Sequence, residues 1–183
     1  MKIYELHIDT GKKDDNLQYQ LASTEKSFLN EFEKYVDGIE RIEDKLSNLK
    51  LQVIRGKRQA DFAMLWNGSC LYLVNKKAKV ILDPLVNGAA EFISMDNELY
   101  LLHVLCAADA LDIENIEANK YNNMIGYIKK FAFKSEEIPD SEIFRVTCES
   151  RIYTSAIFVT DRFKKVVEEN SLIGFKFKEI GDY

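Results

Sequence analysis

The pattern of apolar and polar positions repeats in two stretches of the chain. Residues 71–93 read as an apolar strand, a helical stretch, Asn87-Gly88 and a second apolar strand. Residues 157–177 follow the same order, with Gly174 as the corresponding stop. Apolar runs joined by helical periodicity and closed by glycine are typical of strand–helix–strand units. We therefore expect two similar strand–helix–strand units, and neither shows the motif of a nucleophile, a metal site or a phosphate loop.

Other stretches show the period-two alternation of strands. In residues 2–9, Tyr4, Leu6 and Ile8 alternate with polar residues, which predicts a half-buried strand. Residues 99–105 are almost continuously apolar, which predicts a central strand covered on both faces. Further strands are expected at 49–53, 61–66, 125–133 and 143–146.

The remaining segments complete the expected fold. A helix capped by Ser23 or Thr24 is predicted to run to about Val36, and the asparagine-rich stretch through Asn123 is predicted to be an irregular connection. Because strands outnumber helices and short turns join several of them, we expect an α+β fold. It would have a mainly antiparallel or mixed sheet with about three flanking helices. Residues 1–183 would form one unit, or a small lobe (1–48) and a main lobe (49–183) that share an interface.

Composition narrows the possible functions. The 183 residues are 46% hydrophobic and carry a net charge of −5, so the chain can build a core and lacks the basic surface that nucleic-acid binding needs. No apolar run approaches the roughly 18 residues that span a bilayer, and the start resembles a strand rather than a signal peptide. Cys70, Cys106 and Cys148 are odd in number and widely spaced, which favours a reducing cytoplasm over a disulfide framework. We expect a cytoplasmic protein that binds neither nucleic acid nor membrane.

Candidate chemistry in the chain is sparse. His103 and Cys106 are spaced to share a helical face as metal ligands, but they lie in an apolar run that favours a buried pair. No CxxC or HxxxH spacing occurs, so no metal, no cofactor and no catalytic residue are predicted. The alternative is a small cytosolic enzyme that combines His103 with Asp109 or Asp112.

Acidic residues gather in two clusters. The first cluster contains Asp37, Glu40, Glu43 and Asp44, and the second contains Glu136, Glu137, Asp140 and Glu142. Charge runs of this kind are commonly solvated loops. The functional alternative is a docking surface for a basic partner, because charge steers encounter and sets specificity. Trp66, Tyr72 and Tyr100 are either anchors of such an interface or part of the core.

Several of these segments together resemble a known family. They are Asp61-Phe62, Leu71 to Val74, Lys76 to Leu85, Glu91 to Ile93, Leu99 to Leu102, Asp109 to Asp112, Ile143 to Arg145, Ile157 to Thr160 and Leu172 to Phe177. The chain is similar over residues 49–180 to a bacterial immunity-protein family of polymorphic toxin systems. That family was first catalogued as a domain of unknown function and is typified by a myxobacterial member. A neighbouring immunity family shares the tail pattern, so the choice among related families stays open.

The resemblance implies a cytoplasmic, non-enzymatic protein that binds and neutralises a cognate toxin domain and so protects the producing cell. It assigns no catalytic residue and does not fix the toxin-contacting residues. The two acidic clusters are our own prediction of the partner-binding surface. A self-associating regulatory module is a further alternative, and the sequence leaves the oligomeric state open.

Overall fold

The computed structural model describes residues 1–46, 48–122 and 124–183, which form three α-helices and fourteen strands. The helices are α1 (Lys26–Asp37), α2 (Lys76–Leu82) and α3 (Asp161–Glu169). Sheet A contains β1 (Lys2–Ile8), β8 (Ala107–Ala108), β11 (Ile143–Cys148), β12 (Arg151–Ile152), β13 (Phe158–Thr160) and β14 (Phe175–Asp182). Sheet B contains β2 (Gln18–Leu21), β3 (Leu51–Arg55), β4 (Phe62–Leu65), β5 (Tyr72–Asn75), β6 (Ala90–Ser94) and β7 (Leu99–Val104). β9 (Glu117–Tyr121) and β10 (Met124–Lys130) pair as a separate two-stranded ribbon. These elements confirm the α+β fold with mixed sheets.

The two predicted strand–helix–strand units are both present. The first is β5–α2–β6 and the second is β13–α3–β14. In each unit another strand lies between the two strands and is antiparallel to both: β7 in the first unit and β1 in the second. The two strands of each unit are therefore parallel to each other, and each unit is a split β-α-β motif.

Local chemistry explains how these units begin and end. The Asn75 side chain accepts a hydrogen bond from the Ala78 amide at 2.9 Å, and the Thr160 hydroxyl caps α3 in the same way through the amide of Phe163. α2 ends at Leu82, two residues before Pro84. The glycines that precede the second strands both have positive φ, which an L side chain adopts only with strain.

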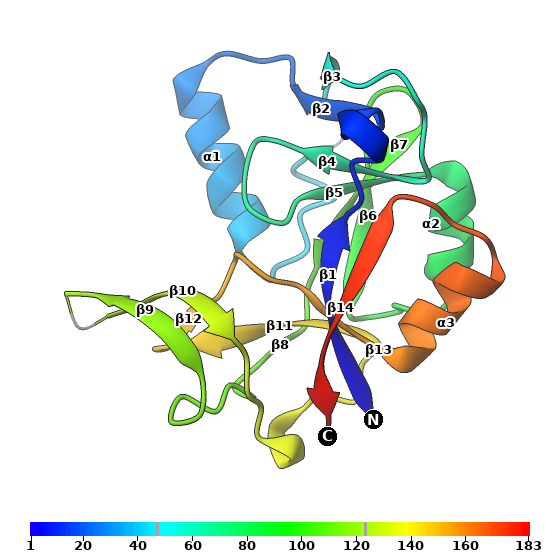
Figure 1. The fold of residues 1–183 in the computed structure, drawn as a ribbon. Helices are drawn as coiled ribbons and strands as arrows, with labels where there is room; N and C mark the ends of the chain where they lie inside the picture. Colours follow the sequence, from blue (N-terminus) through cyan, green and yellow to red (C-terminus); the bar gives the residue numbers. More distant parts are fainter. Residues whose placement is uncertain (47, 123) are drawn as a thin grey trace.

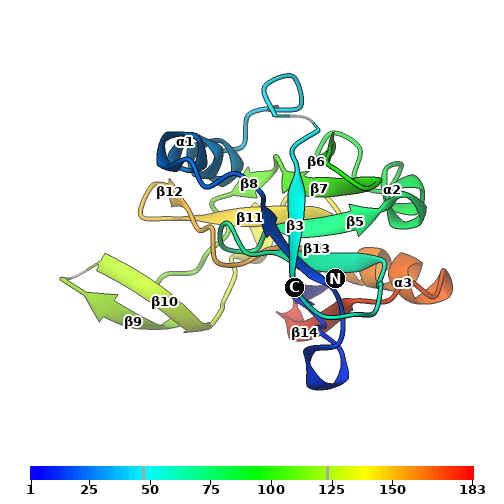
Figure 2. The same cartoon turned by 90° about the horizontal axis from the view of Figure 1, so that it is seen from above.

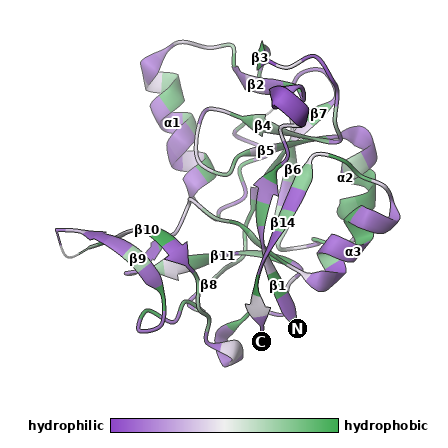
Figure 3. Ribbon diagram, viewed as in Figure 1, coloured by the Kyte–Doolittle hydropathy of each residue, from purple (hydrophilic) through white to green (hydrophobic). Residues whose placement is uncertain are grey.

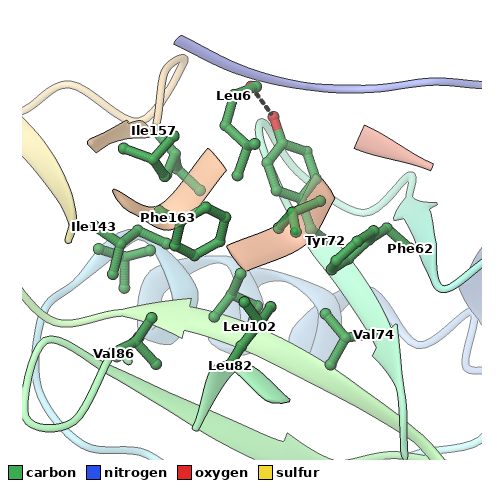
Figure 4. Close-up of a cluster of buried hydrophobic side chains, with 14 of the residues drawn as sticks. Leu6, Phe62, Tyr72, Val74, Leu82, Val86, Leu102, Ile143, Ile157 and Phe163 are labelled. Carbon is green, nitrogen blue, oxygen red and sulfur yellow. Dashed lines mark hydrogen bonds between the residues drawn. The ribbon is translucent and has the colours of Figure 1, made fainter. Parts of the chain in front are cut away.

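The two sheets pack face to face around a shared core. This core takes Tyr4, Leu6 and Val159 from sheet A, and Tyr72 and Leu102 from sheet B. α2 and α3 add their apolar faces, and Figure 4 shows Phe163 among these side chains, with the Tyr72 hydroxyl bonded to the Leu6 carbonyl. Figures 1 and 2 show α2 and α3 on one side of the molecule and α1 on the other.

α1 covers the other face of sheet B through its own apolar stripe. Phe32 and Val36 of α1 are buried against Leu73, Ile93 and Leu101 of the sheet. Figure 3 shows the alternation of hydrophobic and hydrophilic segments along α1 that makes this packing possible. β7 is therefore covered on both faces, as its continuous apolar run predicts.

Three local expectations differ from the structure. β1 is buried over four successive residues because it lies between β13 and β14, so it is a central strand and not a half-buried one. β9 lies within the stretch that was expected to be an irregular connection, because its pairing with β10 outweighs its polar composition. The N-cap of α1 is Glu25, and the Ser23 hydroxyl instead accepts a hydrogen bond from the Glu25 amide at 3.3 Å. Asn123 lies outside the described residues.

Candidate functional site

A groove lies between the carboxyl end of α1 and β12. Its volume is about 520 Å³, and we call it the α1–β12 groove. It is lined by Lys34, Tyr35, Gly38, Ile39, Glu40, Ile42 and Ile152. Ile39 is 42% exposed, although it is a large aliphatic residue. Figures 1 and 2 both place α1, β12 and the β9–β10 ribbon on the same side of the molecule.

The first acidic cluster forms part of this groove and its surroundings. Glu40 lines the groove, while Glu43 and Asp44 are exposed in the turn that follows. Asp37 is the half-buried last residue of α1. Burial raises the pKa of the Asp37 carboxyl, the guanidinium of Arg145 opposes this shift, and Glu33 adds to it. Carboxylates therefore lie beside an apolar groove, an arrangement suited to a partner with basic and apolar groups.

The second acidic cluster lies elsewhere. Glu136 and Glu137 are exposed in the 3-10 helix Ser135–Glu137, which Figure 1 shows at the bottom of the molecule, far from α1. Asp140 and Glu142 line a separate depression of about 400 Å³. Glu142 pairs with Arg162 at 3.1 Å and accepts a hydrogen bond from the Thr160 hydroxyl. The structure does not bring the two clusters together, and Glu142 is engaged in contacts within the protein.

Three buried polar side chains lie beneath the α1–β12 groove. Glu91 on β6, His103 on β7 and Arg145 on β11 form this buried polar cluster, and they are 5%, 1% and 2% exposed. Glu91 and His103 are direct cross-strand partners, and His103 Nδ1 lies 3.0 Å from Glu91 Oε1. Both side chains project from the face of sheet B that α1 covers, since they alternate with residues of the core between the sheets.

The buried polar cluster holds the backbone that shapes the groove. His103 Nε2 lies 3.1 Å from the Gly38 carbonyl oxygen, and the Ile42 amide donates to Glu91 Oε1 at 2.7 Å. Arg145 Nη1 donates to the Val36 carbonyl at 3.1 Å. The last carbonyls of a helix lack partners within the helix, and a cation there also favours the helix dipole. The cluster therefore fixes the turn from the end of α1 to Ile42.

The environment of the buried polar cluster shifts the pKa values of His103 and Arg145. Burial lowers the pKa of the His103 imidazole, and the nearby Arg145 guanidinium lowers it further, whereas the hydrogen bonds with Glu91 and the Gly38 carbonyl oppose the shift. Burial also lowers the pKa of Arg145, which the Asp37 carboxylate opposes. Burial and the Arg145 guanidinium therefore both favour the neutral imidazole of His103, while the Asp37 carboxylate favours the charged form of Arg145.

The other candidate chemistry is not assembled around His103. Its partners are Glu91 and Gly38 rather than Cys106, and the imidazole is closed to solvent. Asp109 accepts a hydrogen bond from Thr147, and Asp112 accepts one from Asn115. Among the described residues, no group of three or more His, Cys, Asp or Glu side chains is placed to hold a metal ion. Within the same residues, no helix is long and apolar enough to cross a membrane.

The aromatic candidates separate into two groups. Tyr72 is buried in the core and Tyr100 is partly buried against it, whereas Trp66 is 55% exposed. The sequence pattern did not identify Tyr35, Ile39, Glu91 or Arg145 as candidate functional residues. For Glu91 and Arg145, the sequence does contain one signal of a structural role: each is a charged residue inside an otherwise apolar strand. A charged residue in such a position requires a buried partner.

Comparison with known proteins gives one family. The model of the immunity protein family Imm11 matches residues 44–182. The match includes the whole buried polar cluster, and α1 lies outside it. A search of curated proteins finds no match to the chain.

Proposed function

We propose that this chain, which belongs to the immunity protein family Imm11, binds a cognate bacterial toxin domain in the cytoplasm and neutralises it without catalysis. The supporting observation is the α1–β12 groove, an apolar groove with acidic residues beside it and a backbone held by a buried polar cluster. A binding surface that is ordered before its partner arrives loses less conformational entropy on binding.

The groove fits a basic partner surface. Residues 31–45 contain six acidic and three basic residues, a net charge of −3 within a chain of −5, and Lys45 pairs with Glu40 at 3.8 Å. Such a patch accelerates association with a positively charged surface, and on a nuclease toxin it would occupy the place of nucleic-acid phosphates. Tyr35 and Ile39 would provide the apolar contacts, since interface energy concentrates in aromatic and aliphatic anchors.

Capture followed by a protection assay tests the function. Tagged protein is recovered from its native host and the retained proteins are identified. The toxin-like domain of each is then expressed alone and together with this chain. We expect one domain that arrests growth alone and is harmless in the presence of this chain, with a stable complex of the two purified proteins. The proposal fails if this chain relieves the toxicity of no retained partner.

Charge reversal then tests which acidic cluster binds. One variant carries Glu40→Lys, Glu43→Lys and Asp44→Lys, and the matched control carries Glu136→Lys, Glu137→Lys and Asp140→Lys. We expect the first variant to slow association with the toxin by about tenfold or more at low salt, and less at high salt. The control would bind at the rate of the unmodified protein. Slower association of the second variant alone would place the partner on the second acidic cluster.

A further inference from the structure

β3 is an open edge of sheet B. It pairs with β2, with Tyr19 opposite Val53 and Leu21 opposite Leu51, and among the described residues no strand pairs with its other side. Four of its five residues are exposed, and Val53 and Ile54 are 49% and 42% exposed. Figure 1 shows β3 at the top of the molecule. An edge strand of this kind presents unpaired backbone amides and carbonyls together with apolar side chains.

The other long edges of the two sheets are protected. β14 carries exposed Lys176, Lys178 and Glu179, the kind of charged side chains that discourage strand addition. β6 is buried over four of its five residues, and the Asn48 amide donates to the Ser94 carbonyl at 2.7 Å. β3 therefore differs from them in leaving aliphatic side chains at an uncovered edge.

A shallow pocket adjoins the β3 edge. It has a volume of about 260 Å³ and is lined by Gln18, Ile54, Arg55 and Trp66. Trp66 is held in place although it is exposed: its indole Nε1 donates to the Gln18 side chain at 2.8 Å, and its amide donates to the Tyr19 carbonyl at 2.9 Å. A fixed, exposed indole beside an aliphatic residue forms a receptor for one apolar side chain.

The charge around β3 selects among possible occupants. Residues 50–58 contain Lys50, Arg55, Lys57 and Arg58 and no acidic residue. Arg55 pairs with Asp14 at 3.0 Å and Lys50 with Asp96 at 3.4 Å. Two copies of this edge would bring like charges together, which opposes self-association. An acidic strand would instead place carboxylates beside these cations.

We propose that the β3 edge with the Trp66 pocket is a second docking surface, which takes an extended protein segment of alternating acidic and aliphatic residues by strand addition. The backbone of the segment would continue sheet B, an aliphatic side chain would enter the Trp66 pocket, and carboxylates would contact Lys57 and Arg58. This proposal does not depend on the toxin-binding function, because it concerns a different surface with the opposite charge.

Trp66 provides the readout, because it is the only tryptophan in the chain. A short monomeric peptide in which glutamate alternates with valine is titrated into the full-length protein, and a peptide with lysine in place of glutamate is the charge control. We expect a saturable blue shift of tryptophan emission with the acidic peptide, together with slower amide hydrogen exchange in residues 51–55. Slower exchange is the signature of strand addition that side-chain contacts alone would not give.

Two matched variants make the test specific. Lys57→Glu with Arg58→Glu should weaken binding of the acidic peptide by about tenfold or more. Lys129→Glu with Lys130→Glu, which are exposed on β10, should leave it unchanged.

Four results would overturn the proposal. They are no saturable response at millimolar peptide, equal binding of the lysine peptide, a dimer of this chain with residues 51–55 protected, and a response to an oligothymidine strand instead of the peptide. The dimer would identify a second copy as the occupant, and the oligonucleotide would identify a single-stranded nucleic acid stacked on Trp66.

Discussion

Glu91, His103 and Arg145 are charged or polar residues at positions where their strands are otherwise apolar. Burial of a polar group is costly unless it is hydrogen-bonded, and here Glu91 and His103 contact each other while all three side chains contact the backbone between Val36 and Ile42. Within the described residues, Glu91 Oε2 and Arg145 Nε have no hydrogen-bond partner. Part of this cost is offset because His103 and Arg145 contact carbonyls at the end of α1 and Glu91 accepts from the Ile42 amide. Residues of the family-matched region thus order the turn after α1, which lies outside the match and lines the α1–β12 groove together with Ile152.

Replacement of Glu91 by alanine tests this residue-scale interpretation. The variant would leave the His103 ring and the Ile42 amide without the Glu91 carboxylate as partner. We therefore expect the free energy of unfolding to fall by about 3 kcal/mol. Amide exchange in residues 38–42 should accelerate more than in the sheets. Urea denaturation and hydrogen exchange measure the two effects. Glu98→Ala, in an exposed turn, is the control, and equal losses in the two variants would contradict a structural role for Glu91.

At the scale of elements, the two split β-α-β units share a plan but not their surroundings. Gly88 has a φ of +80° with open space around it, whereas Gly174 has a φ of +115° and faces the backbone of Phe62. A Cβ at residue 174 would lie 2.6 Å from the Phe62 carbonyl oxygen. The same turn therefore serves as a free loop in one unit and as a contact between sheets A and B in the other.

This difference predicts that replacing glycine by alanine lowers the stability of the protein by different amounts at residues 88 and 174. Gly88→Ala should destabilise the protein by about 1–2 kcal/mol, the cost of a left-handed backbone for an L residue. Gly174→Ala should cost about 3 kcal/mol or more, because steric overlap with Phe62 is added. Thermal or urea unfolding of both variants gives the comparison, and a smaller loss at residue 174 than at residue 88 would refute it.

Prediction of the fold from the sequence succeeded where the signals for an element lie within that element's own residues. The two repeated units and the buried β7 run follow from periodicity, caps and glycine stops within short windows. Prediction failed where a distant segment decides the outcome. β9 is a strand because β10 pairs with it, and the partner of His103 is a residue on the adjacent strand that register alone brings opposite. The α1–β12 groove also joins residues more than a hundred positions apart, which no local pattern reveals.

At the scale of the whole molecule, the two sheets share one core. Leu6 and Val159 of sheet A pack with Tyr72 and Leu102 of sheet B, and the Tyr72 hydroxyl donates to the Leu6 carbonyl at 2.8 Å. The segment 1–48 also supplies an interior strand to each sheet, β1 to sheet A and β2 to sheet B. These connections support the proposal that residues 1–183 form one unit rather than two independent lobes.

A single cooperative transition should therefore be observed on unfolding. Trp66 fluorescence reports on sheet B, and hydrogen exchange of β1 and β13 reports on sheet A. We expect the same free energy of unfolding from both probes in urea, since the core that contains Leu6, Tyr72 and Leu102 is shared by the two sheets. Two separated midpoints would instead show that sheets A and B unfold independently, which would contradict a single unit.

The pairing of β1 with β14 also constrains when sheet A can fold during synthesis of the chain. Lys2 lies opposite Asp182 and Ile8 opposite Phe175, so β1, an interior strand of sheet A, receives its last partner only when residues near 182 leave the ribosome. Contacts so distant along the chain slow folding, and β1 lacks both of its partner strands until residues 158–182 have been translated. Under the proposed function, a newly made molecule would therefore begin to protect the cell only after residues 158–182 have been synthesised and have paired with β1.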